Sequence, residues 1–91
     1  ASMIGRKVLF RGAVQGVGFR RRALDIAVGY AVNGYVKNLP DGRVELCAEG
    51  EPAEVERFLA GIATRLGANI AGTDSQDIPP SGFKGFEIRR D

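Results

Sequence analysis

The chain has 91 residues, of which 44% are hydrophobic and 26% are charged, and its formal net charge at pH 7 is +2. It contains no histidine and one cysteine, which excludes histidine bases, serine–histidine triads, an internal disulfide and, in practice, a structural zinc site. No apolar run approaches the ~18 residues of a membrane span, and so small a net charge does not indicate a nucleic-acid binder. We expect residues 1–91 to form a single domain.

The first predicted strand, Lys7 to Ala13, leads into a glycine-rich stretch that closes with Arg20. Glycines stand at positions 12, 16 and 18, and such a loop can gather backbone N–H groups into a nest for an anion. A helix N-terminus behind the loop adds free donors, and an arginine fork suits phosphate oxygens. The spacing fits neither a Walker loop nor a dinucleotide fingerprint. The residues therefore indicate an oxyanion cradle, with a purely structural tight turn as the alternative.

The next predicted elements are a helix from Phe19 to Tyr30 and a strand from Val32 to Leu39. Ala23, Ala27 and Tyr30 share one helix face with Phe19, and we interpret the further apolar residues as a wide core stripe. Ala31 falls where a helix C-cap usually turns left-handed, so glycine there would be neutral or stabilising. A tight turn is predicted after this strand, because the chain continues with Leu39-Pro40-Asp41-Gly42.

A third strand is predicted from Arg43 to Glu49, followed by a second helix that starts at Pro52 and stops at Gly67. Val44, Leu46 and Ala48 alternate with polar residues, which is typical of a sheet with one dry and one wet face. Cys47 falls on the wet side among acids, where we expect an inert thiol. The second helix carries a clean apolar stripe, made of Val55, Phe58, Leu59, Ile62 and Leu66.

The last third of the chain carries weaker signals. A fourth strand should begin near Ala68 to Ala71 and then fade, because residues 72–77 are polar and turn-like. Residues 79–82 read as a loop, and Lys84 to Arg89 as a short final strand. The resulting order, βαββαβ plus a C-terminal strand, predicts an α+β, ferredoxin-like split βαβ sandwich, with two helices on one face of a mainly antiparallel sheet.

Three segments of this order resemble the acylphosphatase family, and together they span the chain from its first strand to its last. They are Gly12-Ala13-Val14-Gln15-Gly16-Val17-Gly18-Phe19-Arg20, Gly34-Tyr35-Val36-Lys37-Asn38-Leu39-Pro40-Asp41-Gly42 and Gly85-Phe86-Glu87-Ile88. The resemblance implies a five-stranded sheet under two helices and hydrolysis of acyl phosphates to a carboxylate and inorganic phosphate. This chain departs from the family pattern in its polar residues 72–78, in Arg21 and Arg22, and in Ala31.

The chemistry of an acyl phosphate fits these residues. Its leaving group is a carboxylate, near pKa 4, which needs no general acid, and phosphoryl transfer to water calls for positioning and charge stabilisation. The resemblance implies that Arg20 binds the phosphoryl group and that Asn38 orients the attacking water. The cradle would be completed by backbone N–H groups of Gly16, Val17, Gly18 and Phe19. The alternatives are a solvated surface charge for Arg20 and a turn-stabilising amide for Asn38. No metal and no cofactor are expected.

Two other functions stay open at the level of sequence. The chain could be an acylphosphatase-like domain of a larger enzyme, such as a hydrogenase-maturation carbamoyltransferase, although those usually place proline where Arg21 stands here. It could instead be a ferredoxin-like RNA-binding module, on the evidence of Lys84-Gly85-Phe86, but the further aromatics of that motif are missing. We expect a cytoplasmic monomer that binds acyl phosphates and neither nucleic acid nor membranes, and Ala1-Ser2 is consistent with an expression remnant.

Overall fold

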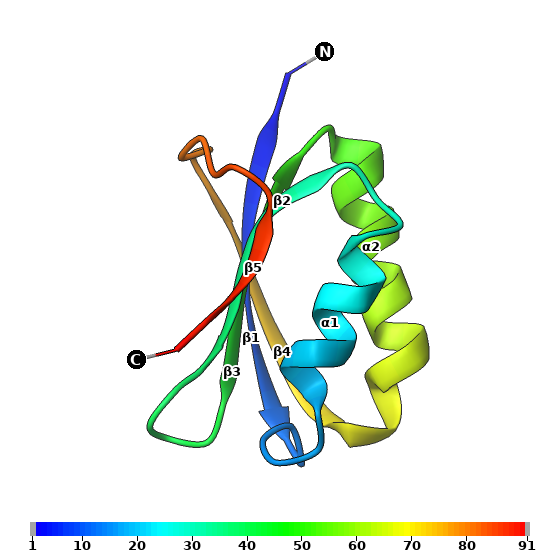
Figure 1. The fold of residues 1–91 in the computed structure, drawn as a ribbon, viewed down its shortest axis with the longest axis vertical. Coiled ribbons are helices and arrows are strands. Elements are labelled where there is room, and N and C mark those ends of the chain that lie inside the picture. Colours follow the sequence, from blue (N-terminus) through cyan, green and yellow to red (C-terminus); the bar gives the residue numbers. More distant parts are fainter. Residues whose placement is uncertain (1, 91) are drawn as a thin grey trace.

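The computed structural model describes residues 2–90, and it contains the helices and strands that the sequence predicts, in the predicted order (Figure 1). The elements are β1 (Ile4–Gly12), α1 (Phe19–Ala27), β2 (Val32–Asn38), β3 (Val44–Gly50), α2 (Pro52–Leu66), a 3-10 turn η1 (Gly67–Asn69), β4 (Ile70–Ile78) and β5 (Phe86–Arg89). Pro52 opens α2 at a position where its missing N–H costs nothing.

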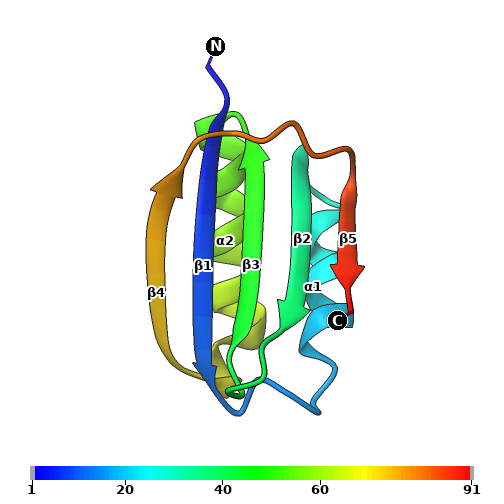
Figure 2. The same ribbon diagram turned by 90° about the vertical axis from the view of Figure 1, so that its left-hand side faces the viewer.

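The five strands form one sheet in the order β4-β1-β3-β2-β5, and both helices lie on the same face of it (Figure 1). Neighbouring strands are antiparallel except β2 and β5, which run parallel. Seen through the sheet, α2 lies behind β1 and β3, and α1 lies behind β2 and β5 (Figure 2). This arrangement confirms the predicted α+β, ferredoxin-like fold, with a mixed and mainly antiparallel sheet.

The core lies between the sheet and the helices, as the apolar patterns predict. In α1 the buried side chains are Phe19, Ala23, Ile26 and Ala27, and in α2 they are Val55, Phe58, Ile62 and Leu66. Phe10 of β1 packs on Phe19 with ring centroids 5.2 Å apart, which anchors the start of α1 to the sheet. Full burial of each such large apolar side chain stabilises the fold by about 1.5–3 kcal/mol.

The polar segment 72–77 is part of a strand, and our prediction that strand four fades there is wrong. β4 pairs with β1 along its length, for example Lys7 with Gln76 and Arg6 with Asp77. An edge strand has one neighbour and much exposed surface, so backbone hydrogen bonds hold it while its side chains stay polar. An ion pair between Arg6 and Asp77, 2.8 Å long, adds to this pairing.

The boundaries of the first two elements also differ from the prediction. β1 begins at Ile4, three residues before Lys7, and α1 ends at Ala27, before Tyr30. Ala31 is not left-handed, because every positive φ in the described residues belongs to a glycine. Its backbone N–H donates instead to Glu54 Oε1 at 2.9 Å. The reason to expect that glycine at position 31 would stabilise the fold is therefore absent.

Cys47 is buried, so its predicted place on a wet face is wrong. β3 is the central strand, and the segment between β4 and β5 crosses the sheet at its upper end in Figure 2. Glu49 accepts backbone hydrogen bonds from Ser81, Gly82 and Phe83, which holds that segment in place. The Cys47 thiol donates to Tyr35 Oη, 3.3 Å away, and burial raises the pKa of the thiol, in keeping with an inert group.

Candidate active site

The glycine-rich loop leaves β1 and enters α1 through two left-handed residues. Gly16 has φ 76°, and Gly18, the residue that caps α1, has φ 76° and ψ 19°. A non-glycine residue would be strained by roughly 1–2 kcal/mol at either position. A Cβ atom added at Gly16 or Gly18 would meet no atom within 4 Å. The glycines are therefore required by the backbone, and the space in front of them is open to a ligand.

Gln15 joins this loop to the turn between β2 and β3. Its Nε2 donates to Leu39 O at 2.8 Å and to Arg43 O at 2.9 Å. Leu39 N also donates to Arg43 O at 2.8 Å, so one side-chain amide binds both ends of the turn. Leu39 directly follows Asn38, so these bonds hold the loop beside the end of β2. The sequence analysis quoted Gln15 within the motif but assigned it no role.

Arg20 and Asn38 line the same pocket, which has a volume of about 160 Å³. The predicted cradle residues Gly16, Gly18 and Phe19 line it too, whereas Val17 does not and is 43% exposed. Arg20 is partly buried in the first turn of α1. The complete lining consists of Val14, Gly16, Gly18, Phe19, Arg20, Arg21, Asn38, Ile88 and Arg90.

Asn38 ends β2 and carries a buried oxygen with no partner. Its Oδ1 makes no hydrogen bond to any described residue, which is uncommon for a buried acceptor and costs roughly 1–3 kcal/mol. The following turn uses another side chain, because Arg43 N donates to Asp41 Oδ1 at 3.0 Å. The Asn38 side chain thus belongs to the pocket lining and carries an oxygen that has no partner among the described residues.

Ile88 and Arg90 belong to the pocket through the last strand, and the sequence analysis did not find them. β5 pairs in parallel with β2, with Ile88 beside Val36 and Arg89 beside Lys37. The next residue, Arg90, then falls beside Asn38. Finding these two residues required the register between strands that lie far apart in the chain.

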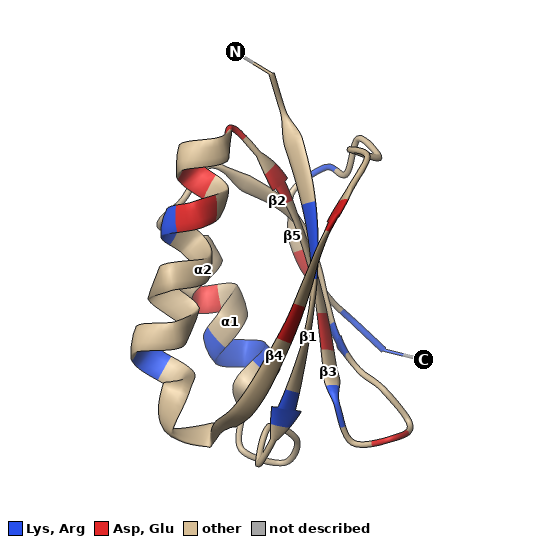
Figure 3. Cartoon of the chain, turned by 180° about the vertical axis from the view of Figure 1, so that it is seen from behind, with Lys and Arg blue, Asp and Glu red and all other residues tan. Residues whose placement is uncertain are grey.

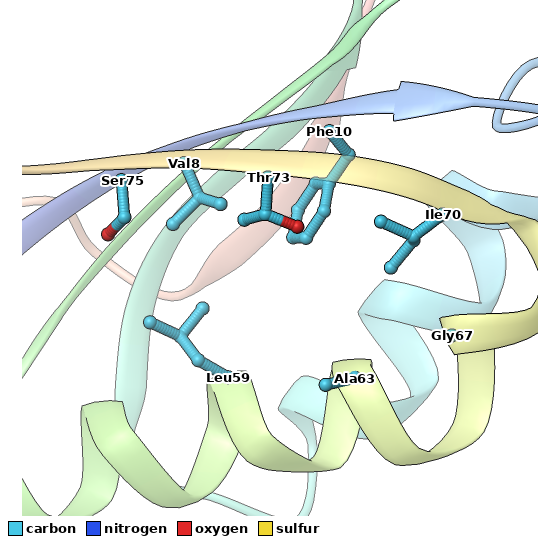
Figure 4. Close-up of a pocket in the computed structure, with 8 residues that line it drawn as sticks. All are labelled: Val8, Phe10, Leu59, Ala63, Gly67, Ile70, Thr73 and Ser75. Carbon is cyan, nitrogen blue, oxygen red and sulfur yellow. The ribbon is translucent and has the colours of Figure 1, made fainter.

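A second cavity, of about 320 Å³, lies between the sheet and α2 (Figure 4). Leu59 and Ala63 of α2 point toward it from one side, and Thr73 and Ser75 of β4 from the other (Figure 4). Its lining holds no charged side chain, so it offers nothing to hold a phosphate.

Neither helix in residues 2–90 combines the length and hydropathy of a membrane span. Over the same residues, no group of three or more His, Cys, Asp or Glu side chains could hold a metal ion.

The fold and the pocket together define a small α+β protein with an anion-binding loop at the start of its first helix. Comparison with known proteins identifies the class more closely, because the sequence profile of the family "Acylphosphatase" matches residues 6–88. An acylphosphatase from Methanospirillum hungatei is 43% identical over 86 residues, covering 92% of this chain and 94% of that protein. The chain belongs to the acylphosphatase family, and it is an enzyme of that class.

Solved structures agree with this assignment. The crystal structure of an acylphosphatase from Bacillus subtilis superposes with a TM-score of 0.88 at 28% identity, covering 96% of this chain and 99% of that one. A crystal structure of full-length HypF, in its phosphate- and nucleotide-bound form, matches with a TM-score of 0.85 at 25% identity. That match covers 98% of this chain but 12% of HypF, so the same fold also occurs as a small part of a larger protein.

Proposed function

We propose that the chain hydrolyses the carboxyl–phosphate bond of acyl phosphates, with Arg20 and the glycine-rich loop binding the phosphoryl group and Asn38 orienting the water. The observation that carries this proposal is the pocket itself. It is lined by a permanent cation, by an open loop at a helix N-terminus and by Asn38, whose amide oxygen has no partner among the described residues, and its volume is about 160 Å³. These are the groups that transfer of a phosphoryl group to water requires.

The reaction divides between these groups. The phosphoryl oxygens lie against the N–H groups of Gly16, Val17, Gly18 and Phe19 and the guanidinium of Arg20, which stabilise the charge that spreads over them. The water oxygen attacks phosphorus while the bond from phosphorus to the carboxyl oxygen breaks. The carboxylate leaves unprotonated, because it is a weak base. Asn38 Oδ1 accepts a hydrogen bond from the water and fixes its direction without removing its proton. The protons of the water stay with the phosphoryl group, so the products are the carboxylate and protonated inorganic phosphate.

The direct test is turnover of benzoyl phosphate with and without a strong chelator. We expect hydrolysis to benzoate and inorganic phosphate at a rate that the chelator does not change, because the proposed groups are an arginine, an amide and backbone N–H groups. Activity that is lost on chelation and restored by magnesium would contradict the metal-independent mechanism. An absence of turnover would contradict the proposed function itself.

We also propose that residues 1–91 form one domain that acts as a monomer in the cytoplasm. The single domain is supported by the Methanospirillum relative, whose match covers 92% of this chain and 94% of that protein. The single cysteine fits a reducing compartment. Size-exclusion chromatography with light scattering tests the monomer, and localisation of the tagged protein in its own cells tests the compartment. An RNA-binding role has less support, because Phe86 packs on Phe58 of α2, with centroids 5.4 Å apart, and is not free to stack on a base.

A further inference from the structure

Three arginines line the pocket, and two of them lie at its rim. Arg20 is partly buried, while Arg21 and Arg90 are exposed, and within residues 2–90 no acidic residue is part of the lining. Arg21 comes from the first turn of α1 and Arg90 from the chain after β5, and both line this pocket. Figure 3 shows both segments coloured for Lys and Arg, with α1 on the helix side of the sheet and the chain after β5 on its other side. Positive charge from two distant parts of the sequence thus converges on one opening.

This charge exceeds what a phosphoryl group balances. The guanidiniums of Arg20, Arg21 and Arg90 contribute three positive charges, and the N-terminus of a helix behaves as about half a charge more. A phosphate group with one ester-like bond carries about −1.5 to −2 at neutral pH. The lining by itself therefore retains roughly one to two positive charges when the phosphoryl group is bound, and Asp25, 3.4 Å from Arg21, offsets them only in part. The remainder favours one further anion.

The exposure of the three arginines places that further anion at the rim. Arg20 is partly buried and stands with the loop at the phosphoryl end, whereas Arg21 and Arg90 are exposed. An acyl group that extends from the loop toward solvent therefore passes Arg21 and Arg90.

We propose that Arg21 and Arg90 bind a carboxylate on the acyl group, so that the preferred substrates are acyl phosphates of dicarboxylic acids. This inference rests on the proposed function and adds the class of acyl group to it. Arg20 and the loop hold the reacting phosphoryl end, and the two rim arginines hold the far end of the same molecule. They act as specificity-determining residues, and they take no part in the bond that breaks.

The neighbouring contacts are consistent with this role. Arg21 lies 3.4 Å from Asp25, but both side chains are well exposed, at 73% and 60%, and such surface pairs are weak and easily exchanged. Arg22 provides a natural comparison. Its guanidinium donates to Arg65 O at 3.1 Å, and it does not line the pocket. Neutralising Arg22 therefore removes one charge near the site without touching the rim.

The experiment compares two substrates of the same shape, 4-carboxybenzoyl phosphate and 4-isopropylbenzoyl phosphate. Their leaving groups are similar, and the rigid ring keeps the second carboxylate from attacking the acyl carbon. Wild-type enzyme should show a kcat/KM for the carboxy substrate roughly fivefold or more above that for the isopropyl one, as two surface ion pairs allow. The ratio should fall toward one at 1 M salt, where the screening length is about 3 Å.

Three variants of equal charge change separate the possible outcomes. Arg90→Gln and Arg21→Gln should each reduce the ratio severalfold, mainly through KM of the carboxy substrate, while Arg22→Gln leaves it unchanged. A wild-type ratio of one overturns the inference and leaves the proposed function standing. An equal loss on both substrates in Arg90→Gln or Arg21→Gln also overturns it, because that arginine would then bind the phosphoryl end. Failure to hydrolyse either substrate refutes the proposed function instead.

Discussion

At the scale of single residues, Arg20 and Asn38 share a pocket but meet different parts of the reaction. Arg20 contacts phosphoryl oxygens in both the ground state and the transition state, so its loss should damage phosphate binding and kcat together. Lysine should replace it poorly, because a point charge cannot reproduce the bidentate fork. Asn38 acts on the water, so Asn38→Ala should lower kcat by about 10²-fold while phosphate inhibition stays nearly unchanged.

The measurements that distinguish these roles are kcat and the phosphate inhibition constant for folded Asn38→Ala. Stability must be measured on the same protein, because alanine could loosen the turn that begins at Leu39. A weakened inhibition constant with near-normal kcat would make Asn38 a phosphate ligand. The loss of a buried, unpartnered oxygen should by itself stabilise the fold slightly, which helps to keep this variant folded.

Gln15 is a positioning residue whose effect should depend on Asn38. Its two hydrogen bonds, 2.8 and 2.9 Å long, fix the loop against the turn that follows Asn38. Gln15→Met keeps the size of the side chain and removes both bonds. We expect kcat to fall about tenfold, because small displacements of a positioned water are costly. In an Asn38→Ala background the same substitution should cost little more, and equal losses in both backgrounds would show that Gln15 only stabilises the fold.

At the scale of elements, the segment between β4 and β5 depends on one carboxylate. Glu49 is 1% exposed and accepts N–H bonds from Ser81, Gly82 and Phe83. Glu49→Ala should lower the free energy of unfolding by about 2–3 kcal/mol, since three donors lose their acceptor. Urea denaturation measures this loss, and hydrogen exchange at residues 81–86 should accelerate. Glu51→Ala is the control, because that side chain makes no capping hydrogen bond, and an equal loss there would contradict the assignment.

Glu45, a second carboxylate on strand β3, makes the free energy of unfolding depend on pH. Burial raises the pKa of Glu45, but the hydrogen bond from Tyr35 and the charges of Lys7 and Lys37 outweigh it, and the net pKa is lowered. A lowered folded-state pKa gives stability that is present above the unfolded value, about 4.3, and is lost as pH falls through the folded one. Glu45→Gln should therefore be less stable than wild type at pH 7 by urea denaturation. A difference that persists unchanged at pH 2 would refute this linkage.

The helices and strands also show which parts of the fold and of the site can be predicted from the sequence and which cannot. Helix stripes and strand alternation place the core, because apolar burial follows local periodicity. The prediction that β4 fades is wrong because its pairing with β1 uses backbone atoms and leaves polar side chains such as Gln76 outside. Motif spacing predicts Arg20 and Asn38, because Arg20 follows the glycine-rich loop in the chain and Asn38 directly precedes the turn that begins at Leu39. Ile88 and Arg90 reach the same pocket only through the parallel register of β2 and β5, which no local pattern carries.

At the scale of the whole molecule, the pocket joins the loop, the start of α1 and the ends of β2 and β5. A ligand there contacts parts of the chain that separate on unfolding, so inorganic phosphate should stabilise the native state only. The gain is RT ln(1 + [L]/Kd), about 2.7 kcal/mol at a hundredfold excess over Kd. For a domain of this size, that free energy corresponds to an increase in Tm of roughly 10–20 °C.

Thermal unfolding of three proteins in phosphate, with chloride at matched ionic strength as the reference, tests this expectation. Wild type and Arg22→Gln should gain the full increase in Tm, because Arg22 lies outside the pocket lining. Arg20→Gln should lose most of it, since the cradle then keeps its N–H groups but loses its cation. The chloride reference removes general effects of salt on surface charge, which would act on all three proteins alike. An equal gain in Arg20→Gln and wild type would mean that phosphate binds elsewhere on the molecule, and the assignment of the glycine-rich loop as the phosphoryl site would then be wrong.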